Sequence, residues 1–142
     1  MGQAYELALK AKAQGEVPVG AVLVTQENLL LGSGWNQVIQ SNDPSAHAEL
    51  IAIREAACKL RNYRLLNTTL YVTLEPCPMC AGALVHARIS RLVFATRDFK
   101  TGAAGSVFNL LAGCPLNHKV QIDEGVMQKN CADLLSVFFR NR

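Results

Sequence analysis

Apolar residues recur along the chain with two different periods, which predict alternating helices and strands. Spacings of three and four residues predict helices at 4–14, 45–62, 78–88, 106–112 and 126–140. Short runs of β-branched and apolar residues predict strands at 19–25, 28–34, 69–73, 91–95 and 119–122. The short polar stretch between the first two strands indicates a hairpin. This order favours an α/β fold in which helices cover both faces of one mixed sheet.

The predicted helix at 45–62 has a polar beginning and an apolar face. We expect Ser45 to cap its first turn, and we expect the helix dipole to favour the negative charge of Glu49 near that end. The expected core face consists of Leu50, Ile53, Ala57 and Leu60.

Composition limits the classes of protein that fit this pattern. Of the 142 residues, 50% are hydrophobic and 18% are charged, so the chain can bury a core, and we expect one domain over residues 1–142. No apolar run approaches the roughly 20 residues that cross a bilayer. The first residues lack the features of a signal peptide, so we expect a cytoplasmic protein with no membrane partner. The net charge of +3 permits a nucleic-acid partner without requiring one.

The candidate chemistry lies in two short motifs, A-H-A-E at 46–49 and E-P-C-P-M-C at 75–80, each at the start of a predicted helix. Cys77 and Cys80 can reach one ion together, and His47 can lean over the end of its own helix. The positive helix ends favour thiolate over thiol. One imidazole and two thiolates suit Zn²⁺, and three protein ligands leave its fourth position open for water.

Whether such a site is catalytic depends on its fourth ligand and on Glu49. Cys58 lies roughly 16 Å from His47 along the same predicted helix and cannot bind the same ion. Spacing leaves Cys114 and Cys131 as candidates for a fourth ligand, which would make the site structural. A catalytic site uses a nearby carboxylate as the base for a metal-bound water whose pKa falls towards about 7. Glu49 therefore favours catalysis, unless it is a solvated helix residue.

The two motifs resemble the signature of the zinc-dependent nucleobase deaminases, H-x-E followed by P-C-x-x-C. Segments along nearly the whole chain, among them 16–22, 62–65 and 100–106, resemble the bacterial tRNA-specific adenosine deaminases. The resemblance implies a cytidine-deaminase-like three-layer α/β/α sandwich with a central mixed sheet of five strands. It also implies a zinc-dependent homodimer that converts adenosine to inosine at the wobble position of a tRNA anticodon stem-loop, with Glu49 moving the protons.

The resemblance also assigns substrate contacts. In the family, the position of Asn36 hydrogen-bonds the flipped base and residues 17–19 help to line its pocket. The less favoured alternatives for these residues are a strand-end cap and core packing. Asp98 and Lys100 match a loop that touches the flanking nucleotides, or form a polar turn. One of the two residues Phe138 and Phe139 suits a core face and the other suits base stacking. The expected substrate residues are Val17, Pro18, Val19, Asn36, Ala48, Asp98, Lys100, Phe138 and Arg140.

Two other functions compete with this interpretation. A deaminase of free cytosine, cytidine or guanine would use the same metal motif, and the segment 100–106 is the argument against it. A zinc-stabilised RNA-binding module without catalysis would leave Glu49 without a role. We therefore expect a hydrolase that removes the amino group of adenosine.

Overall fold

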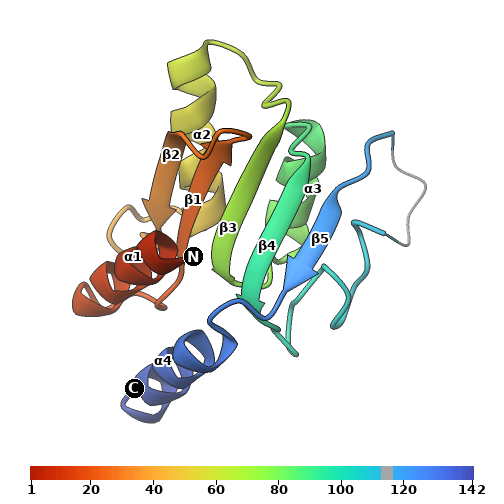
Figure 1. Ribbon diagram of the computed structural model, residues 1–142. Helices are drawn as coiled ribbons and strands as arrows, with labels where there is room; N and C mark the ends of the chain where they lie inside the picture. Colours follow the sequence, from red (N-terminus) through yellow and green to blue (C-terminus); the bar gives the residue numbers. More distant parts are fainter. Residues whose placement is uncertain (113–116) are drawn as a thin grey trace.

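A five-stranded sheet organises the computed structural model, which describes residues 1–112 and 117–142 (Figure 1). The strands are β1 (Gly20–Thr25), β2 (Leu30–Trp35), β3 (Thr68–Leu74), β4 (Arg91–Thr96) and β5 (Gln121–Glu124). Their order across the sheet is β2-β1-β3-β4-β5. The hairpin strand β1 is antiparallel to β2 and to β3, whereas β3, β4 and β5 run parallel. The sheet is therefore mixed, as predicted.

Helices cover both faces of this sheet. Those in the described part of the chain are α1 (Gly2–Ala13), α2 (Ala48–Leu60), α3 (Pro78–His86) and α4 (Gln128–Arg140). The helices α2 and α3 pack on one face, and α1 and α4 lie on the other (Figure 1). This arrangement confirms the predicted three-layer α/β/α sandwich. None of these helices has the length and apolar character that a bilayer span requires.

The packing of α2 on β2 is unusually close because two strand residues lack side chains. A Cβ atom at Gly32 would lie 2.2 Å from the carbonyl oxygen of Ala52, and one at Gly34 would lie 2.6 Å from that of Ala48. The buried face of α2 is correspondingly built from small residues, and Ala48, Ala52 and Ala56 are fully buried. The predicted core face is therefore partly wrong, since Leu60 is 45% exposed.

The start of α2 also differs from the prediction. Ser45 does not cap the helix, because its backbone N–H and its hydroxyl both donate to Oδ1 of Asp43, at 2.8 and 2.7 Å. The N-cap residue is His47, and α2 begins at Ala48. The side chain of Ser45 thus stabilises the loop before α2 and not the first turn of the helix.

The predicted helix at 106–112 is wrong. These residues form turns, with an isolated bridge between Ala104 and Asn109. The backbone N–H groups of Val107 and Phe108 donate to the carbonyl oxygen of Gly102 at 3.0 and 2.9 Å, which is not a helical pattern. The predicted strand at 119–122 is present two residues later, as the edge strand β5.

Candidate active site and metal centre

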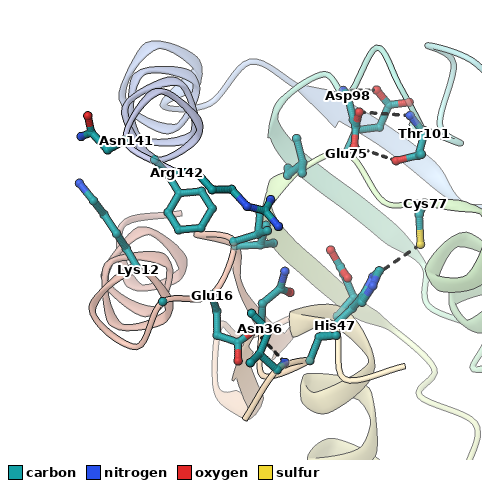
Figure 2. A pocket seen from close by; sticks show the side chains of 18 residues that line it. Lys12, Glu16, Asn36, His47, Glu75, Cys77, Asp98, Thr101, Asn141 and Arg142 are labelled. Carbon is teal, nitrogen blue, oxygen red and sulfur yellow. Dashed lines mark hydrogen bonds between the residues drawn. The ribbon is translucent and has the colours of Figure 1, made fainter. Parts of the chain in front are cut away.

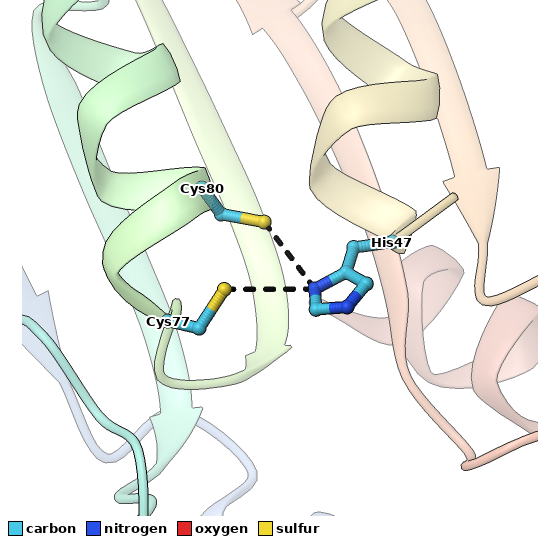
Figure 3. Close-up of side chains that lie close together, drawn as sticks. All are labelled: His47, Cys77 and Cys80. Atoms are coloured by element: carbon cyan, nitrogen blue, oxygen red, sulfur yellow. Dashed lines mark hydrogen bonds between the residues drawn. The ribbon is translucent and has the colours of Figure 1, made fainter. Parts of the chain in front are cut away.

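Three metal-ligating side chains meet where α2 and α3 begin (Figure 3). Nδ1 of His47 lies 3.6 Å from Sγ of Cys77 and 3.5 Å from Sγ of Cys80, and the three ligand atoms all lie within 4.8 Å of one another. His47 and Cys77 are the N-caps of their helices, and Cys80 belongs to the first turn of α3. Pro78 occupies the first position of α3, where a missing N–H removes no helical hydrogen bond.

The three ligand atoms fit a tetrahedral zinc ion. Zn–S bonds of about 2.3 Å and Zn–N bonds of about 2.0–2.1 Å, opened to the tetrahedral angle, place nitrogen and sulfur about 3.6 Å apart. The two observed distances between His47 Nδ1 and the sulfur atoms are 3.6 and 3.5 Å. A soft donor set of one imidazole and two thiolates also suits zinc.

Within residues 1–112 and 117–142, no further His, Cys, Asp or Glu joins these three ligands. Cys131 is buried in α4 and Cys58 is exposed on α2, so neither completes the site. Cys114, the other candidate for a fourth ligand, lies outside the described residues. The described ligand set therefore has the three-residue composition of a catalytic zinc site.

The electrostatics of the site favour an anionic thiolate ligand for a metal ion. Both helices direct their N-termini, and hence their positive dipole ends, at the ligands. Hydrogen bonds with Cys80 and with His47 lower the pKa of Cys77 to about 4, and the bond to Cys77 raises the pKa of His47. The pKa of Cys80 is raised by its hydrogen bond to Cys77 and by burial. The site thus favours one thiolate, at Cys77, and metal binding would displace the proton of the second thiol.

Glu49 lies beside the ligands in the first turn of α2. Its side chain is 4% exposed, and Oε2 accepts a hydrogen bond from Sγ of Cys80 at 3.0 Å. Burial raises the pKa of this carboxyl group. It can therefore hold a proton at a pH at which an exposed carboxyl has lost it, as a proton-transferring group must. Its burial excludes the alternative of a solvated helix residue.

A cavity of about 620 Å³ has Glu49 in its wall. Figure 2 shows the side chains that line this cavity, with the ligands His47 and Cys77 among the labelled ones. The cavity volume lies in the range of about 300–1,000 Å³ that is typical of small-molecule sites. His47, Glu49 and Cys77 lie in its wall. The remaining wall comes from the segments 12–19, 36–39, 74–75, 98–101 and 138–142. The chain therefore places a ligand-sized space next to the metal ligands.

The expected substrate residues divide between the cavity and its surroundings. The cavity is lined by Val17, Val19, Asn36, Asp98 and Phe138. The other four expected residues do not line it: Pro18 and Ala48 are buried, and Lys100 and Arg140 are exposed.

Of the two roles that the sequence left open for Asp98, the structure shows the polar turn. Its Oδ1 accepts hydrogen bonds from the backbone N–H groups of Lys100 at 2.9 Å and Thr101 at 3.2 Å. Its Oδ2 accepts the hydroxyl of Thr101 at 2.9 Å. The residue thus organises a polar turn and presents that turn to the cavity.

Sequence reasoning missed two buried acidic residues of the cavity wall, Glu16 and Glu75, each 2% exposed. Glu16 accepts hydrogen bonds from the backbone N–H groups of Ile39 at 3.2 Å and Gln40 at 2.9 Å, and so holds the loop between β2 and α2. Glu75 holds the loop after β4. Both carboxylates adjoin apolar strand segments in the sequence, and this juxtaposition is the signal that could have identified them.

The C-terminal end of α4 supplies aromatic and cationic groups. Phe138 is half-buried in the cavity wall, whereas Phe139 is 50% exposed, and the two rings meet edge to face at 5.3 Å. The guanidinium of Arg142 lies 6.0 Å from the ring of Phe139. Figure 2 shows Arg142 extending from the end of α4 towards the cavity, with Lys12 on α1 also at the rim.

Comparisons with known proteins agree with this geometry. Residues 1–96 match the family described as the cytidine and deoxycytidylate deaminase zinc-binding region. The chain is 54% identical to the tRNA-specific adenosine deaminase of Haemophilus influenzae, over 100% of this chain and 82% of that one. It is 48% identical to the tRNA-specific adenosine deaminase of Buchnera aphidicola subsp. Schizaphis graminum, over 98% of this chain and 91% of that one.

Solved structures share the fold. A structure from a study of A-to-I editing by tRNA:A34 deaminases at the wobble position of transfer RNA matches with a TM-score of 0.91 and 38% identity, over 95% of this chain and 97% of that one. The guanine deaminase of Nitrosomonas europaea matches with a TM-score of 0.82 and 25% identity, over 96% and 81% of the two chains. Identity is thus higher to the proteins described as acting on tRNA.

Proposed function

The chain belongs to the cytidine and deoxycytidylate deaminase family, among the tRNA-specific adenosine deaminases, and we propose that it hydrolyses adenosine to inosine at the wobble position of a tRNA anticodon loop. The observation that carries the proposal is the burial of Glu49 beside three zinc ligands at the wall of a ligand-sized cavity. A structural zinc site has no use for such a carboxylate. Identity to tRNA-specific relatives along the whole chain supports the choice of substrate.

His47, Cys77 and Cys80 would hold the zinc ion. A bound zinc ion would supply Lewis-acid polarisation of a water molecule, which would make that water a nucleophile near neutral pH. The helix starts fix the backbone of all three ligands, so the ligand set needs little rearrangement to receive the metal.

Glu49 moves the protons of the reaction. Its carboxylate takes a proton from the attacking water as oxygen adds to C6 of adenine, and it gives this proton to ring nitrogen N1. It then carries the remaining hydroxyl proton to the amino group, which leaves as ammonia. The raised pKa of Glu49 suits a group that must both accept and donate protons. Overall, adenosine and water become inosine and ammonia.

The cavity would hold the target base flipped out of the anticodon loop. Val17 and Val19 offer an apolar wall, and the amide nitrogen of Asn36 can donate a hydrogen bond to the base. Pro18 and Ala48 would contribute through the backbone that shapes this wall. We propose that the nucleotides next to the target base contact Asp98, Lys100, Phe138 and Arg140. The half-buried ring of Phe138 and the exposed cations of Lys100 and Arg140 support this assignment.

We further propose that the protein is a homodimer of single-domain chains in the cytoplasm. Leu60, Tyr63 and Leu66 are 45%, 67% and 61% exposed along one segment, which supports a partner surface there. None of the four described cysteines takes part in a disulfide, in keeping with a reducing compartment. The buried hydrophobic side chains of the described residues form one core cluster, which supports a single domain. Light scattering after size-exclusion chromatography should give twice the 15.4 kDa of one chain, and a mass of 15.4 kDa would reject the dimer.

The test of the proposed function uses a tRNA anticodon stem-loop that carries adenosine at the wobble position. After incubation with the zinc-loaded protein, nucleoside analysis should show inosine, and a stem-loop with adenosine moved to the next anticodon position should remain unchanged. Free cytidine and free guanine are the comparison substrates. Deamination of either without conversion of the stem-loop would favour a deaminase of a free base or nucleoside, a class that includes the structurally similar guanine deaminase. Binding of the stem-loop without deamination of any substrate would favour an RNA-binding module.

A further inference from the structure

The carboxylate of Glu75 accepts hydrogen bonds from four donors in the loop that follows β4. Oε1 accepts the backbone N–H of Asp98 at 3.1 Å and the hydroxyl of Ser106. Oε2 accepts the backbone N–H groups of Ala104 at 2.9 Å and Ser106 at 3.1 Å. The side chain is 2% exposed, and no Lys or Arg in the described segments forms a salt bridge with it. Because a buried charge needs compensating donors, the loop and the carboxylate stabilise each other.

This hydrogen-bonded unit extends to the metal site. Glu75 precedes the ligand Cys77 by two residues, and the carbonyl oxygen of the intervening Pro76 accepts the N–H of Ala103 at 2.8 Å. The 98–106 loop is therefore bonded by side chain and by backbone to the segment that carries Cys77. A shift of this loop relative to the metal ligands would break these bonds.

The loop packs directly against the carboxylate. A Cβ atom at Gly102 would lie 2.4 Å from Cδ of Glu75 and 2.5 Å from the carbonyl oxygen of Asp98, so only glycine fits there. Asp98 and Thr101 line the cavity, and their positions follow from this contact. The wall of the cavity thus depends on one side chain whose two oxygens are both directed at the loop.

We propose that Glu75 is a positioning residue, which fixes the 98–106 wall of the cavity relative to the metal ligands so that the wall meets the nucleotides beside the target base. The inference rests on the proposed deamination of an RNA loop. Glu75 acts through Asp98 and its neighbours and not on the reacting atoms, so it should govern substrate binding more than the chemical step.

The substitution Glu75→Gln tests this role, because a carboxylate only accepts hydrogen bonds whereas an amide also donates them. Whichever way the amide is turned, its NH₂ group faces the N–H of Asp98 or those of Ala104 and Ser106. We expect KM for the stem-loop to rise about tenfold or more, with kcat within about threefold and zinc content unchanged. Amide hydrogen exchange should become faster at Asp98, Ala104 and Ser106 and stay unchanged in α2.

Glu27→Gln is the matched control, because it makes the same chemical change in an exposed carboxylate in the turn between β1 and β2, which is not part of the 98–106 loop. Its KM should stay within about twofold of the original value. Glu75→Asp keeps both acceptor oxygens on a shorter side chain and should recover part of the lost binding. If Glu75→Gln does not fold, Ser106→Ala, which removes only the hydroxyl donor, should raise KM in the same direction by a smaller factor.

Two results would overturn the inference. One is an unchanged KM and unchanged exchange in a folded, zinc-loaded Glu75→Gln protein. The other is a loss of zinc or a fall in kcat at constant KM, which would mean that Glu75 acts on the metal ligands. Failure of the unsubstituted protein to convert the stem-loop would instead reject the proposed function, and hydrogen exchange would still report whether Glu75 holds the loop.

Discussion

The side-chain oxygen of Asn36 accepts a hydrogen bond from the backbone N–H of Ala48 at a distance of 2.9 Å. Asn36 directly follows β2, and Ala48 is the first residue of α2, between His47 and Glu49. One hydrogen bond thus joins the cavity wall to the helix start that carries a metal ligand and the proposed proton carrier. Because the amide oxygen already accepts this hydrogen bond, the amide nitrogen is the group with which Asn36 can donate a hydrogen bond to a substrate base.

Two substitutions of Asn36 separate these roles. Asn36→Asp keeps an acceptor for the N–H of Ala48 but removes the amide donor, whereas Asn36→Ala removes both. We expect both variants to lose about 100-fold in kcat/KM on the stem-loop. Only Asn36→Ala should lose stability, by about 1–2 kcal/mol, in thermal unfolding. Full activity of Asn36→Asp would contradict the base contact, and full stability of Asn36→Ala would contradict the helix-capping role.

Local patterns predicted most of the fold because most of its elements carry their own signal. The strand β3 is a run of apolar and β-branched residues, and Leu70 and Val72 in it are fully buried. Residues 106–112 carry an apolar pattern as well, yet they form turns, because the N–H groups of 107, 108 and 110 donate back to the carbonyl oxygens of 102 and 103. This turn is held in place by the bond from Ser106 to Glu75, 31 residues earlier in the chain. Periodicity contains no information about a partner at that distance.

The same distinction applies to the candidate site. The ligand spacing of Cys77 and Cys80 and the polar start of α2 are local features, so the sequence was enough to predict a metal centre. The loop contacts of Glu16 and Glu75 exist only after the chain has folded. The alanine face of α2 likewise depends on the glycines of β2 across the interface, and the sequence of the helix does not reveal it.

The close contact between β2 and α2 makes Gly34 intolerant of a side chain. In Gly34→Ala, the new Cβ atom would lie 2.6 Å from the carbonyl oxygen of Ala48 and would displace the start of α2. We expect a loss of about 1–3 kcal/mol in unfolding free energy and reduced zinc affinity. Gly82→Ala is the control, since nothing lies within 4 Å of a Cβ atom at this helical glycine. It should stabilise the protein by about 0.5–1 kcal/mol, and equal effects at both positions would contradict the packing argument.

Zinc should be required for activity and should stabilise the fold. Treatment with a chelator is expected to abolish deamination and lower the melting temperature, and added Zn²⁺ should restore both. Cys80→Ala removes one ligand and should lower zinc affinity roughly 100-fold or more, as measured by elemental analysis and competition with a chelator. Cys58→Ala, on the exposed side of α2, should retain one zinc per chain. Full metal content in Cys80→Ala would refute the ligand assignment.

Thiol alkylation should distinguish the cysteines by pH. Burial raises the pKa of the Cys131 thiol to about 11. Because the thiolate is the reactive form, its alkylation should be slow at pH 8 and increase about tenfold per pH unit towards pH 11. In a Cys114→Ser background with zinc bound, mass spectrometry should find the exposed Cys58 modified first, with Cys77 and Cys80 protected until the metal is removed. Rapid modification of Cys131 at pH 8 would contradict its burial.

Glu49→Gln tests the chemical step most directly. The amide keeps the shape of the side chain and avoids burying a charge, so the variant should fold and retain one zinc per chain. It cannot accept the proton of the attacking water, and general acid–base groups contribute about 10²–10⁴-fold to rate. We therefore expect kcat on the stem-loop to fall at least about 1,000-fold while KM changes little.

Glu55→Gln provides the matched control, because Glu55 lies on the same helix and is exposed. Its kcat should equal that of the unsubstituted protein, which shows that the loss in Glu49→Gln comes from the buried position and not from the helix charge. A kcat of Glu49→Gln within about tenfold of the normal value would contradict the proton-transfer role of Glu49. No other carboxylate among the described residues bonds to a ligand sulfur and could take over this role. Glu49→Gln could also be inactive because it has lost zinc. In that case its activity would return when Zn²⁺ is added. Added Zn²⁺ cannot restore activity if the variant lacks only the group that transfers the proton.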